Sequence, residues 1–167
     1  MKDLKTMAQL LTTGLLWFSA IGCGLIAGVY FAFSTFVMTS LARIAPAAGI
    51  AAMNAINAVI VTSVFMPVFL GTTLAAAVLA GLAFFRWSGP GSTAVLAGGA
   101  VYVIGMLAVT LVFNVPLNNA LAAVDPSNAD SAALWARYVR DWTLWNNIRM
   151  AASAAACTLF IVGIAVK

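Results

Sequence analysis

The side chains best able to do chemistry in this chain are amides, hydroxyls and a guanidinium that interrupt long apolar stretches. They fall into four groups along the sequence: Tyr30, Ser34 and Thr35; Asn54, Asn57, Thr62 and Ser63; Asn114, Asn118 and Asn119; and Asn146, Asn147 and Arg149. Amide and guanidinium N–H groups donate hydrogen bonds, so together they could hold an oxyanion or a polar head group. Polar groups are costly inside hydrocarbon, and their positions therefore carry information about function.

Spacing places members of these groups on shared helix faces. Asn54 and Asn57 are three residues apart, and Asn114 and Asn118 are four apart with Pro116 between them. Proline lacks an N–H and crowds the carbonyl four residues earlier, so we expect Pro116 to disturb its helix. Carbonyls freed in this way need protein or water partners inside a membrane, which suits a polar pocket.

Two interpretations of these residues stay open. Asn146 and Arg149 are three residues apart, and Ser153 continues their stripe. The amides could cap helices and join the bundle at the membrane interface, while Arg149 extends to the lipid head groups. Alternatively, they converge on a ligand site. The number of amides favours the second interpretation, because one membrane end needs far fewer.

Membrane-spanning helices must position these groups. Of the 167 residues, 64% are hydrophobic and 7% are charged, whereas soluble domains carry about 25% charged residues. The charges leave long uncharged intervals at 6–42, 44–85, 87–124 and 150–166, and a membrane helix needs only ~20 apolar residues. We predict a single domain, 1–167, with spans at roughly 8–38, 56–85, 94–119 and 144–166. Continuous apolar runs, without alternation, argue against a β-barrel.

The predicted fold is an all-α integral membrane four-helix up-down bundle. Breaks are expected near Pro46, at the turn 88–92 and at 125–128. Trp135, Tyr138 and Trp142 recur at helical spacing, which predicts a short interfacial amphipathic helix around 129–142, between helices 3 and 4. An up-down arrangement brings the four polar groups to the same end of the bundle.

The net charge of +4 is too small for a nucleic-acid interface, so the basic residues are interpreted as those that set the orientation of the chain in the membrane. The face with the chain termini carries four basic residues and the opposite face three, once Arg149 is left out: Lys2, Lys5, Arg86 and Lys167, against Arg43, Arg137 and Arg140. We place the chain in a bacterial inner membrane with cytoplasmic termini, an orientation that requires Arg149 to lie within the membrane. A homo-oligomer stays open.

No cofactor is predicted. The chain has no His and no Glu, and Cys23 and Cys157 are far apart in sequence, so a zinc, haem or di-iron site is not expected. Both cysteines are interpreted as buried packing residues. The sequence contains no phosphate-binding loop and no dinucleotide fingerprint. Glycines such as Gly24 and Gly28 are spaced for close helix packing.

Four strings carry a family resemblance: AGVYFAFSTFVM at 27–38, MNAIN at 53–57, FNVPLN at 113–118 and WTLWNNIR at 142–149. Together they resemble the anthrone-oxygenase-like family of small four-helix membrane proteins, across nearly the whole chain and in the same order. The resemblance implies oxidation of anthrones to anthraquinones without a metal or flavin. Two positions depart from the family pattern: Asn147 stands where a His is expected, and Thr62-Ser63 stands where many relatives carry Asn-Pro.

These considerations predict a cofactor-independent oxygenase or oxidase for a lipophilic phenolic or polycyclic, anthrone-like substrate. Arg149 would anchor the enolate oxygen, and Asn146, Asn118 and Asn114 would donate hydrogen bonds to it. Further substrate contacts are assigned to Asn57, Tyr30, Ser34, Tyr138, Trp142 and Trp145. Asp141 could accept the proton if it points inward, although an ion pair with Arg137 or Arg140 is preferred for it.

The alternative is a non-catalytic membrane protein that binds a lipid or a quinone-like ligand, or a subunit of a larger membrane complex. A polar pocket open at one end suits such a head group equally well. A complete transport path is not expected, because the opposite end of the predicted bundle offers few polar residues.

Overall fold

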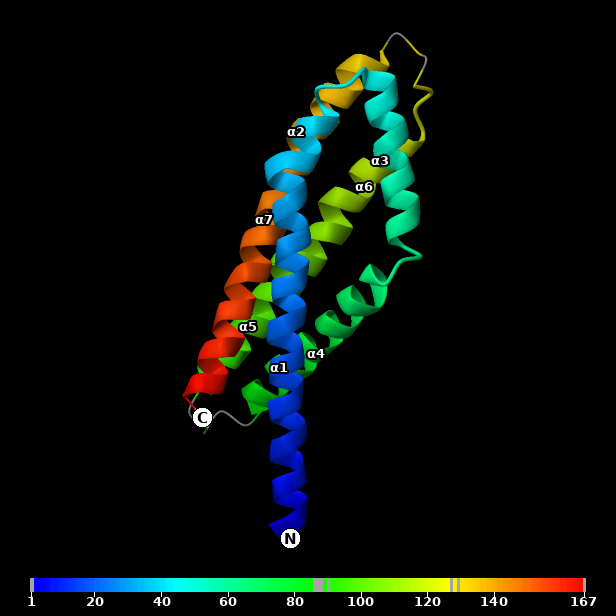
Figure 1. Cartoon of the computed structure of the whole chain (residues 1–167). Helices are drawn as coiled ribbons and strands as arrows, with labels where there is room; N and C mark the ends of the chain where they lie inside the picture. Colours follow the sequence, from blue (N-terminus) through cyan, green and yellow to red (C-terminus); the bar gives the residue numbers. More distant parts are fainter. Residues whose placement is uncertain (1, 86–88, 90, 127, 129, 167) are drawn as a thin grey trace.

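The computed structural model describes residues 2–85, 89, 91–126, 128 and 130–166, and every regular element in this part of the chain is helical. Four helices are long and apolar enough to cross a membrane: Thr6–Leu41, Phe65–Phe85, Ser92–Ala122 and Ser131–Ala165. Both termini lie at one end of the molecule, and α2 and α3 lie at the other (Figure 1). The predicted all-α membrane bundle with four spanning helices is confirmed.

The first span is a continuous rod of α1 (Lys2–Ala32), the π-helical segment η1 (Phe33–Val37) and α2 (Met38–Leu41). It extends beyond the predicted range 8–38, because no glycine or proline interrupts the sequence between Gly28 and Pro46. The wide turns of η1 include Ser34, one of the predicted site residues. Such π-turns inside α-helices often occur at functional sites.

The predicted second span, 56–85, is divided in the structure. A shorter apolar helix, α3 (Pro46–Ile60), is followed by the spanning helix α4 (Phe65–Phe85). The Ser63 hydroxyl donates to the Ile60 carbonyl at 2.8 Å and accepts from the Phe65 N–H at 3.2 Å, so it caps the start of α4. Pro67 cannot donate to the Ser63 carbonyl, which removes the bond that would continue the helix.

The third span comprises α5 (Ser92–Tyr102), the π-helical segments η2 (Val103–Ala108) and η3 (Thr110–Asn114), and α6 (Val115–Ala122). Pro116 lies in the first turn of α6, and the π-helical hydrogen bonding comes immediately before it. The predicted disturbance at Pro116 is therefore present: the helix continues, but with wider turns that avoid the missing N–H donor.

The last span, α7 (Ser131–Ala165), is a single helix of 35 residues. The segment predicted around 129–142 is helical from Ser131, but it forms the first part of α7 and is not a separate interfacial helix. Continuity follows from the sequence, since no glycine or proline occurs between Ser131 and Val162. The separate short helix of the fold is α3, between the first and second spans (Figure 1).

Several predicted features fall partly outside the described residues. Ser88 and Pro90 of the turn 88–92, Ser127 and Ala129 of the following loop, and the charged residues Arg86 and Lys167 belong to this group. Gly91 is described and has a left-handed backbone, with φ of 79°. A Cβ at this glycine would come within 3.0 Å of the Gly163 carbonyl, so both its conformation and its surroundings require glycine.

Buried side chains form two clusters along the bundle. The terminal core, toward the chain termini, comprises Leu16, Ala20, Cys23, Ile26, Tyr30, Phe69, Ala76, Leu79, Ala83, Val95, Tyr102, Met106, Ala156 and Phe160. The aromatic core, toward α2 and α3, comprises Met38, Ile50, Met53, Leu121, Trp135, Tyr138 and Trp142. Residues of both clusters border a cavity that lies between them.

Candidate functional site

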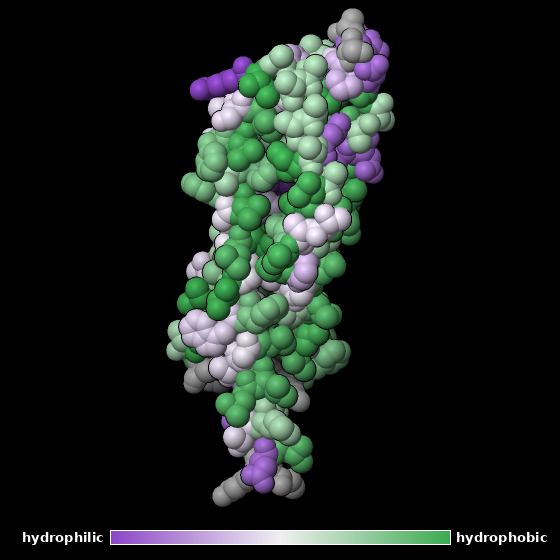
Figure 2. All heavy atoms as spheres, turned by 45° about the vertical axis from the view of Figure 1, so that its right-hand side comes forward, coloured by the Kyte–Doolittle hydropathy of each residue, from purple (hydrophilic) through white to green (hydrophobic). Residues whose placement is uncertain are grey.

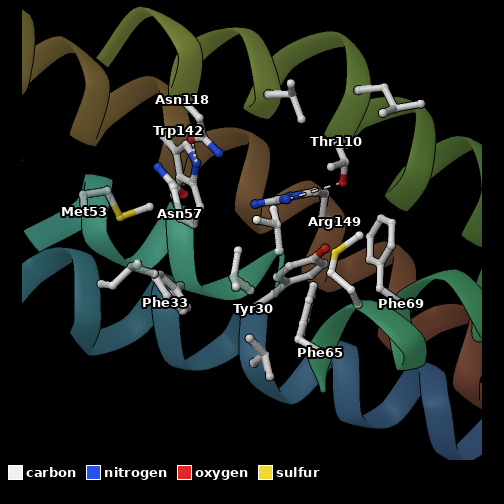
Figure 3. Close-up of a pocket in the computed structure, with 17 residues that line it drawn as sticks. Tyr30, Phe33, Met53, Asn57, Phe65, Phe69, Thr110, Asn118, Trp142 and Arg149 are labelled. Carbon is white, nitrogen blue, oxygen red and sulfur yellow. Dashed lines mark hydrogen bonds between the residues drawn. The ribbon is translucent and has the colours of Figure 1, made fainter. Parts of the chain in front are cut away.

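A cavity of about 220 Å³ lies between the terminal core and the aromatic core. All four spans and α3 contribute to its lining: Val29, Tyr30, Phe33, Met53, Ile56, Asn57, Ile60, Val61, Phe65, Met66, Phe69, Thr110, Leu111, Val115, Asn118, Trp142 and Arg149. The walls are thus apolar and aromatic, with a few polar groups that converge on the interior (Figure 3). This composition is typical of small-molecule sites.

Arg149 brings a buried cation to this cavity, with only 5% of its surface exposed. At about 1.5 Å per residue it lies about 27 Å along α7 from Ser131 and about 24 Å from Ala165. Its place near the middle of the helix differs from the predicted position one turn inside a span. The difference arises because α7 begins at Ser131 and not near residue 144. Its side chain is buried and bonds to Asn146, so it does not extend outward to the head groups.

Neighbouring groups hold the guanidinium in place. Its Nη2 donates to the Asn146 Oδ1 at 2.8 Å, and its Nη1 lies 3.4 Å from the Thr110 hydroxyl. The guanidinium carbon stands 4.3 Å from the Tyr30 ring centroid and 5.2 Å from that of Trp142. Two aromatic faces therefore contribute cation–π attraction to a charge removed from water.

Asn146 orients Arg149 from behind the cavity wall. Its Nδ2 donates to the Tyr30 carbonyl at 2.8 Å and to the Ser34 hydroxyl at 2.7 Å, and its side chain is fully buried. Both bonds reach the first span near η1, where the π-helical turns alter the carbonyl pattern. The amide nitrogen is thereby used up, so Asn146 positions Arg149 and has no N–H left for a ligand.

A second polar region lies beside Trp142. The Asn118 Oδ1 accepts hydrogen bonds from the Tyr138 hydroxyl at 2.8 Å and from the Trp142 Nε1 at 2.9 Å. The Asn57 Nδ2 is buried and has no acceptor among the described residues. Asn114 is also buried, and its Nδ2 donates to the Trp142 carbonyl at 3.3 Å. Figure 3 shows Asn57 and Asn118 close together next to Trp142, at some distance from Tyr30.

The charge of Arg149 has no carboxylate partner at the cavity. None of the lining residues is acidic, and the ion pair recorded in the described part of the chain joins Arg140 and Asp141 at 2.8 Å. Asp141 therefore makes the preferred surface ion pair, with Arg140, and does not point inward. A buried cation without a counter-ion is costly, which leaves an anionic ligand group as the missing partner.

The structure brings most of the predicted site residues together. Tyr30, Asn57, Asn118, Trp142 and Arg149 line the cavity. Three others lie behind this wall and bond to it: Asn114, Tyr138 and Asn146. Ser34 lies one step further back and accepts a hydrogen bond from Asn146. Trp145 is not among the lining residues, and its ring stacks on Phe113 with centroids 3.5 Å apart.

Other polar residues of the four groups lie elsewhere. Thr35, Thr62 and Asn119 are exposed on the outer surface. Asn147 is exposed as well, and it borders a separate shallow groove together with Arg43 and Arg140. The position at which the family resemblance suggested a His therefore does not face the cavity.

Several lining residues were not predicted from the sequence, notably Thr110, Phe33, Met53 and Phe65. Thr110 lies four residues before Asn114, so the helical stripe through Asn114 and Asn118 could have revealed it. No comparable signal marks the apolar residues, because a side chain facing lipid and one facing a cavity have the same hydrophobic character.

A groove on the apolar outer surface borders the cavity. This shallower groove shares Phe33, Ile56 and Ile60 with the cavity lining and adds Ala55, Val59 and Ser63. Figure 2 shows a hollow in the largely hydrophobic face on this side of the molecule, with a hydrophilic residue at its base.

The comparisons with known proteins agree with the resemblance noted in the sequence. The family model described as anthrone oxygenase matches residues 59–159, which is more than half of the chain. No curated protein and no solved structure matches this chain. The matched region contains Asn118, Trp142 and Arg149, whereas Tyr30 and Asn57 precede it. The predicted family assignment is confirmed: this chain belongs to the anthrone oxygenase family.

Proposed function

We propose that this protein is a membrane-embedded, cofactor-independent oxygenase for a lipophilic phenolic or polycyclic substrate of the anthrone type. The observation that carries the proposal is Arg149, a buried cation without a carboxylate partner at an aromatic-lined cavity. A flat aromatic enolate satisfies both features, because its rings fit between the apolar walls and its oxygen carries the missing negative charge.

Arg149 acts by favouring the anionic form of the substrate. An anthrone loses a proton from the methylene carbon of its central ring to give an electron-rich enolate. The guanidinium stabilises the enolate oxygen more than the neutral ketone, which is the differential binding that catalysis requires. Tyr30 and Trp142 lie against the guanidinium, with ring centroids 4.3 and 5.2 Å from its central carbon, and stabilise its charge.

The enolate supplies the electrons for the reaction with dioxygen. Its methylene carbon forms a C–O bond to one oxygen atom of O2, giving a peroxide anion that takes up one proton. Loss of water then breaks the O–O bond and the remaining C–H bond, and leaves a second carbonyl. One anthrone and one O2 thus yield one anthraquinone and one H2O, with the substrate as the sole reductant.

Oxygen uptake by protein reconstituted in lipid nanodiscs tests this proposal. Anthrone should be consumed with one equivalent of O2, and 18O2 should place one labelled atom in the quinone. Arg149→Met should lower kcat/KM at least tenfold, whereas Asn119→Ala, an exposed amide on α6, should not change it. Uptake no faster than in empty nanodiscs would refute the enzymatic proposal. Saturable anthrone binding without uptake would instead support the non-catalytic alternative.

The proposed location is a bacterial inner membrane with cytoplasmic termini. By the sequence-based assignment, the face with the termini carries four basic residues and the opposite face three once Arg149 is left out, and Arg149 is buried in the bundle. A C-terminal green fluorescent protein fusion should fluoresce, and a C-terminal alkaline phosphatase fusion should be inactive. The opposite pattern would reverse the orientation without affecting the proposed chemistry.

A further inference from the structure

We infer that Asn57 and Asn118 form a second ligand-binding pole, which donates hydrogen bonds to an oxygen acceptor across the ligand from the oxyanion at Arg149. Tyr138 and Trp142 are positioning residues that fix the direction of the Asn118 amide. The inference rests on the proposed function in one respect, namely that during turnover this acceptor is the oxygen delivered by O2.

The orientation of Asn118 follows from the chemistry of its neighbour. The indole Nε1–H of Trp142 can only donate, so the Asn118 atom 2.9 Å from it must be the carbonyl oxygen. The Tyr138 hydroxyl donates a second hydrogen bond to the same oxygen at 2.8 Å. The Asn118 oxygen is therefore satisfied by protein, and the side of Asn118 that remains for a ligand is its NH2 group.

Asn57 adds an N–H donor of the same kind. It lines the cavity from α3, and its buried Nδ2 lacks an acceptor among the described residues. Leaving a buried donor without an acceptor is unfavourable, so an acceptor oxygen supplied by a ligand would gain a hydrogen bond from Asn57. Asn57 and Asn118 come from different helices but lie close together beside Trp142 (Figure 3).

The Arg149 region has the same donor character. A guanidinium has five N–H groups, and two of its nitrogens bond to Asn146 and Thr110, while Nε has no acceptor among the described residues. The Thr110 hydroxyl donates to the Met106 carbonyl at 2.7 Å, so its hydrogen is also engaged. The cavity thus has two separate groups of N–H donors, one at Arg149 and one at Asn57 and Asn118, that could bind acceptor oxygens.

This arrangement matches the reaction proposed above. The enolate oxygen and the reacting methylene carbon lie on opposite sides of the central ring of an anthrone. With the enolate oxygen at Arg149, the methylene carbon is directed across the cavity. The peroxide anion formed there carries its charge on the terminal oxygen, and N–H groups of Asn57 and Asn118 stabilise it as an oxyanion hole does. After loss of water, the same amides bind the new carbonyl.

The test compares affinities of three probes without turnover. Anthracene, anthrone and anthraquinone share the ring system and carry no oxygen, one oxygen and two opposite oxygens. Binding to the nanodisc-embedded protein is measured under argon by quenching of tryptophan fluorescence. The unmodified protein should bind anthraquinone more tightly than anthrone, and anthrone more tightly than anthracene.

The variants Asn57→Leu and Asn118→Leu should each lower the ratio of anthraquinone to anthrone affinity by about fivefold, the value of one neutral hydrogen bond. Tyr138→Phe should lower it less, because Trp142 still holds the Asn118 oxygen. Anthracene affinity should stay within about twofold in all three, since it depends on ring contacts alone. Asn119→Leu, the neighbouring exposed amide on the same helix, is the matched control.

An unchanged ratio in both Asn57→Leu and Asn118→Leu, or no preference for anthraquinone in the unmodified protein, would overturn the inference. An equal change in Asn119→Leu would do the same. Asn57→Leu keeps the test decisive if Asn118→Leu fails to fold, because neither of the two hydrogen bonds that hold the Asn118 oxygen involves Asn57. If the unmodified protein takes up no oxygen but the two variants still lower the ratio of anthraquinone to anthrone affinity, the second pole is supported and only the proposed reaction is refuted.

Discussion

The two cores of this bundle are built from different side chains and perform different tasks. In the terminal core, helices approach so closely that a Cβ at Gly99 would come 2.5 Å from the Ala76 carbonyl, and one at Gly105 would come 2.6 Å from the Ala152 Cβ. In the aromatic core, rings make the contacts: Trp135 and Tyr138 stack with centroids 5.6 Å apart, and the Trp135 ring packs against Gly49.

This contrast indicates that different parts of the bundle provide stability and function. Lipid is as apolar as leucine, so helices gain little from hydrophobic burial and must associate through close backbone packing and hydrogen bonds. The terminal core relies on close packing. Near the aromatic core, large rings and amides leave a cavity open, and hydrogen bonds such as those of Asn146 hold its walls together.

The largest expected effect separates ligand binding from stability at Arg149. Arg149→Met should lower anthrone-enolate affinity by ~1.5–3 kcal/mol, the usual contribution of a charged hydrogen bond, while the melting temperature stays the same or rises. Removal of an uncompensated buried charge relieves a cost, and methionine fills the space. Arg149→Lys should restore little affinity, because an ammonium does not reproduce the planar fork. Equal losses of affinity and stability would make Arg149 a structural residue.

The terminal core should show the opposite behaviour. Gly99→Ala is expected to destabilise the protein by ~1–3 kcal/mol through overpacking, because the new methyl group would press on the Ala76 carbonyl and the Ala80 Cβ. Ligand affinity of the folded fraction should be unchanged. Gly81→Ala is the control, since no atom lies within 4 Å of a Cβ at that position. Thermal unfolding in detergent compares the two variants, and equal melting temperatures would contradict this account of the core.

A smaller effect is expected at Trp145, which tests where the site ends. Trp145→Ala removes the stacking on Phe113 and should cost ~0.5–1.5 kcal/mol of stability in addition to lost apolar contact. Anthrone affinity should not change, because Trp145 does not line the cavity. A tenfold loss of affinity, measured by the same fluorescence titration, would place the residue in the site after all.

The smallest effect is expected at Asn147, the position where the family resemblance suggested a His. Asn147→His should leave the rate of oxygen uptake and its pH dependence unchanged, because this residue is exposed and borders a different groove from the cavity. A clear gain in rate, with a dependence on imidazole ionisation, would show that position 147 communicates with the substrate.

The sequence was sufficient to predict the features that depend on the spacing of polar and charged residues and on the free-energy cost of placing them in hydrocarbon. Uncharged run lengths predicted four spans, because charges are excluded from hydrocarbon. The amides at Asn57 and Asn118 and the guanidinium of Arg149 were predicted to converge, because an up-down bundle aligns those segments. All three line one cavity.

Features that depend on competition between local helix-breaking interactions and overall hydropathy were not predictable in the same way. The break before α4 results from the Ser63 cap together with Pro67, inside a run whose hydropathy alone suggests one helix. The continuity of α7 had no signal beyond the absence of breakers, and it moved Arg149 from the end of a span to its middle. Trp142 and Trp145 could not be distinguished, because hydropathy does not separate lipid-facing from cavity-facing rings.

The most direct test of the central role of Arg149 is the ionisation of bound anthrone, followed under argon by the visible absorbance of its anion. If Arg149 supplies the missing counter-charge, the pKa of bound anthrone should be at least one unit lower than in empty nanodiscs, which corresponds to about 1.4 kcal/mol. In Arg149→Met that decrease should disappear while binding remains measurable. A bound anthrone whose pKa is unchanged or raised in the unmodified protein, or lowered equally in both proteins, would contradict the account.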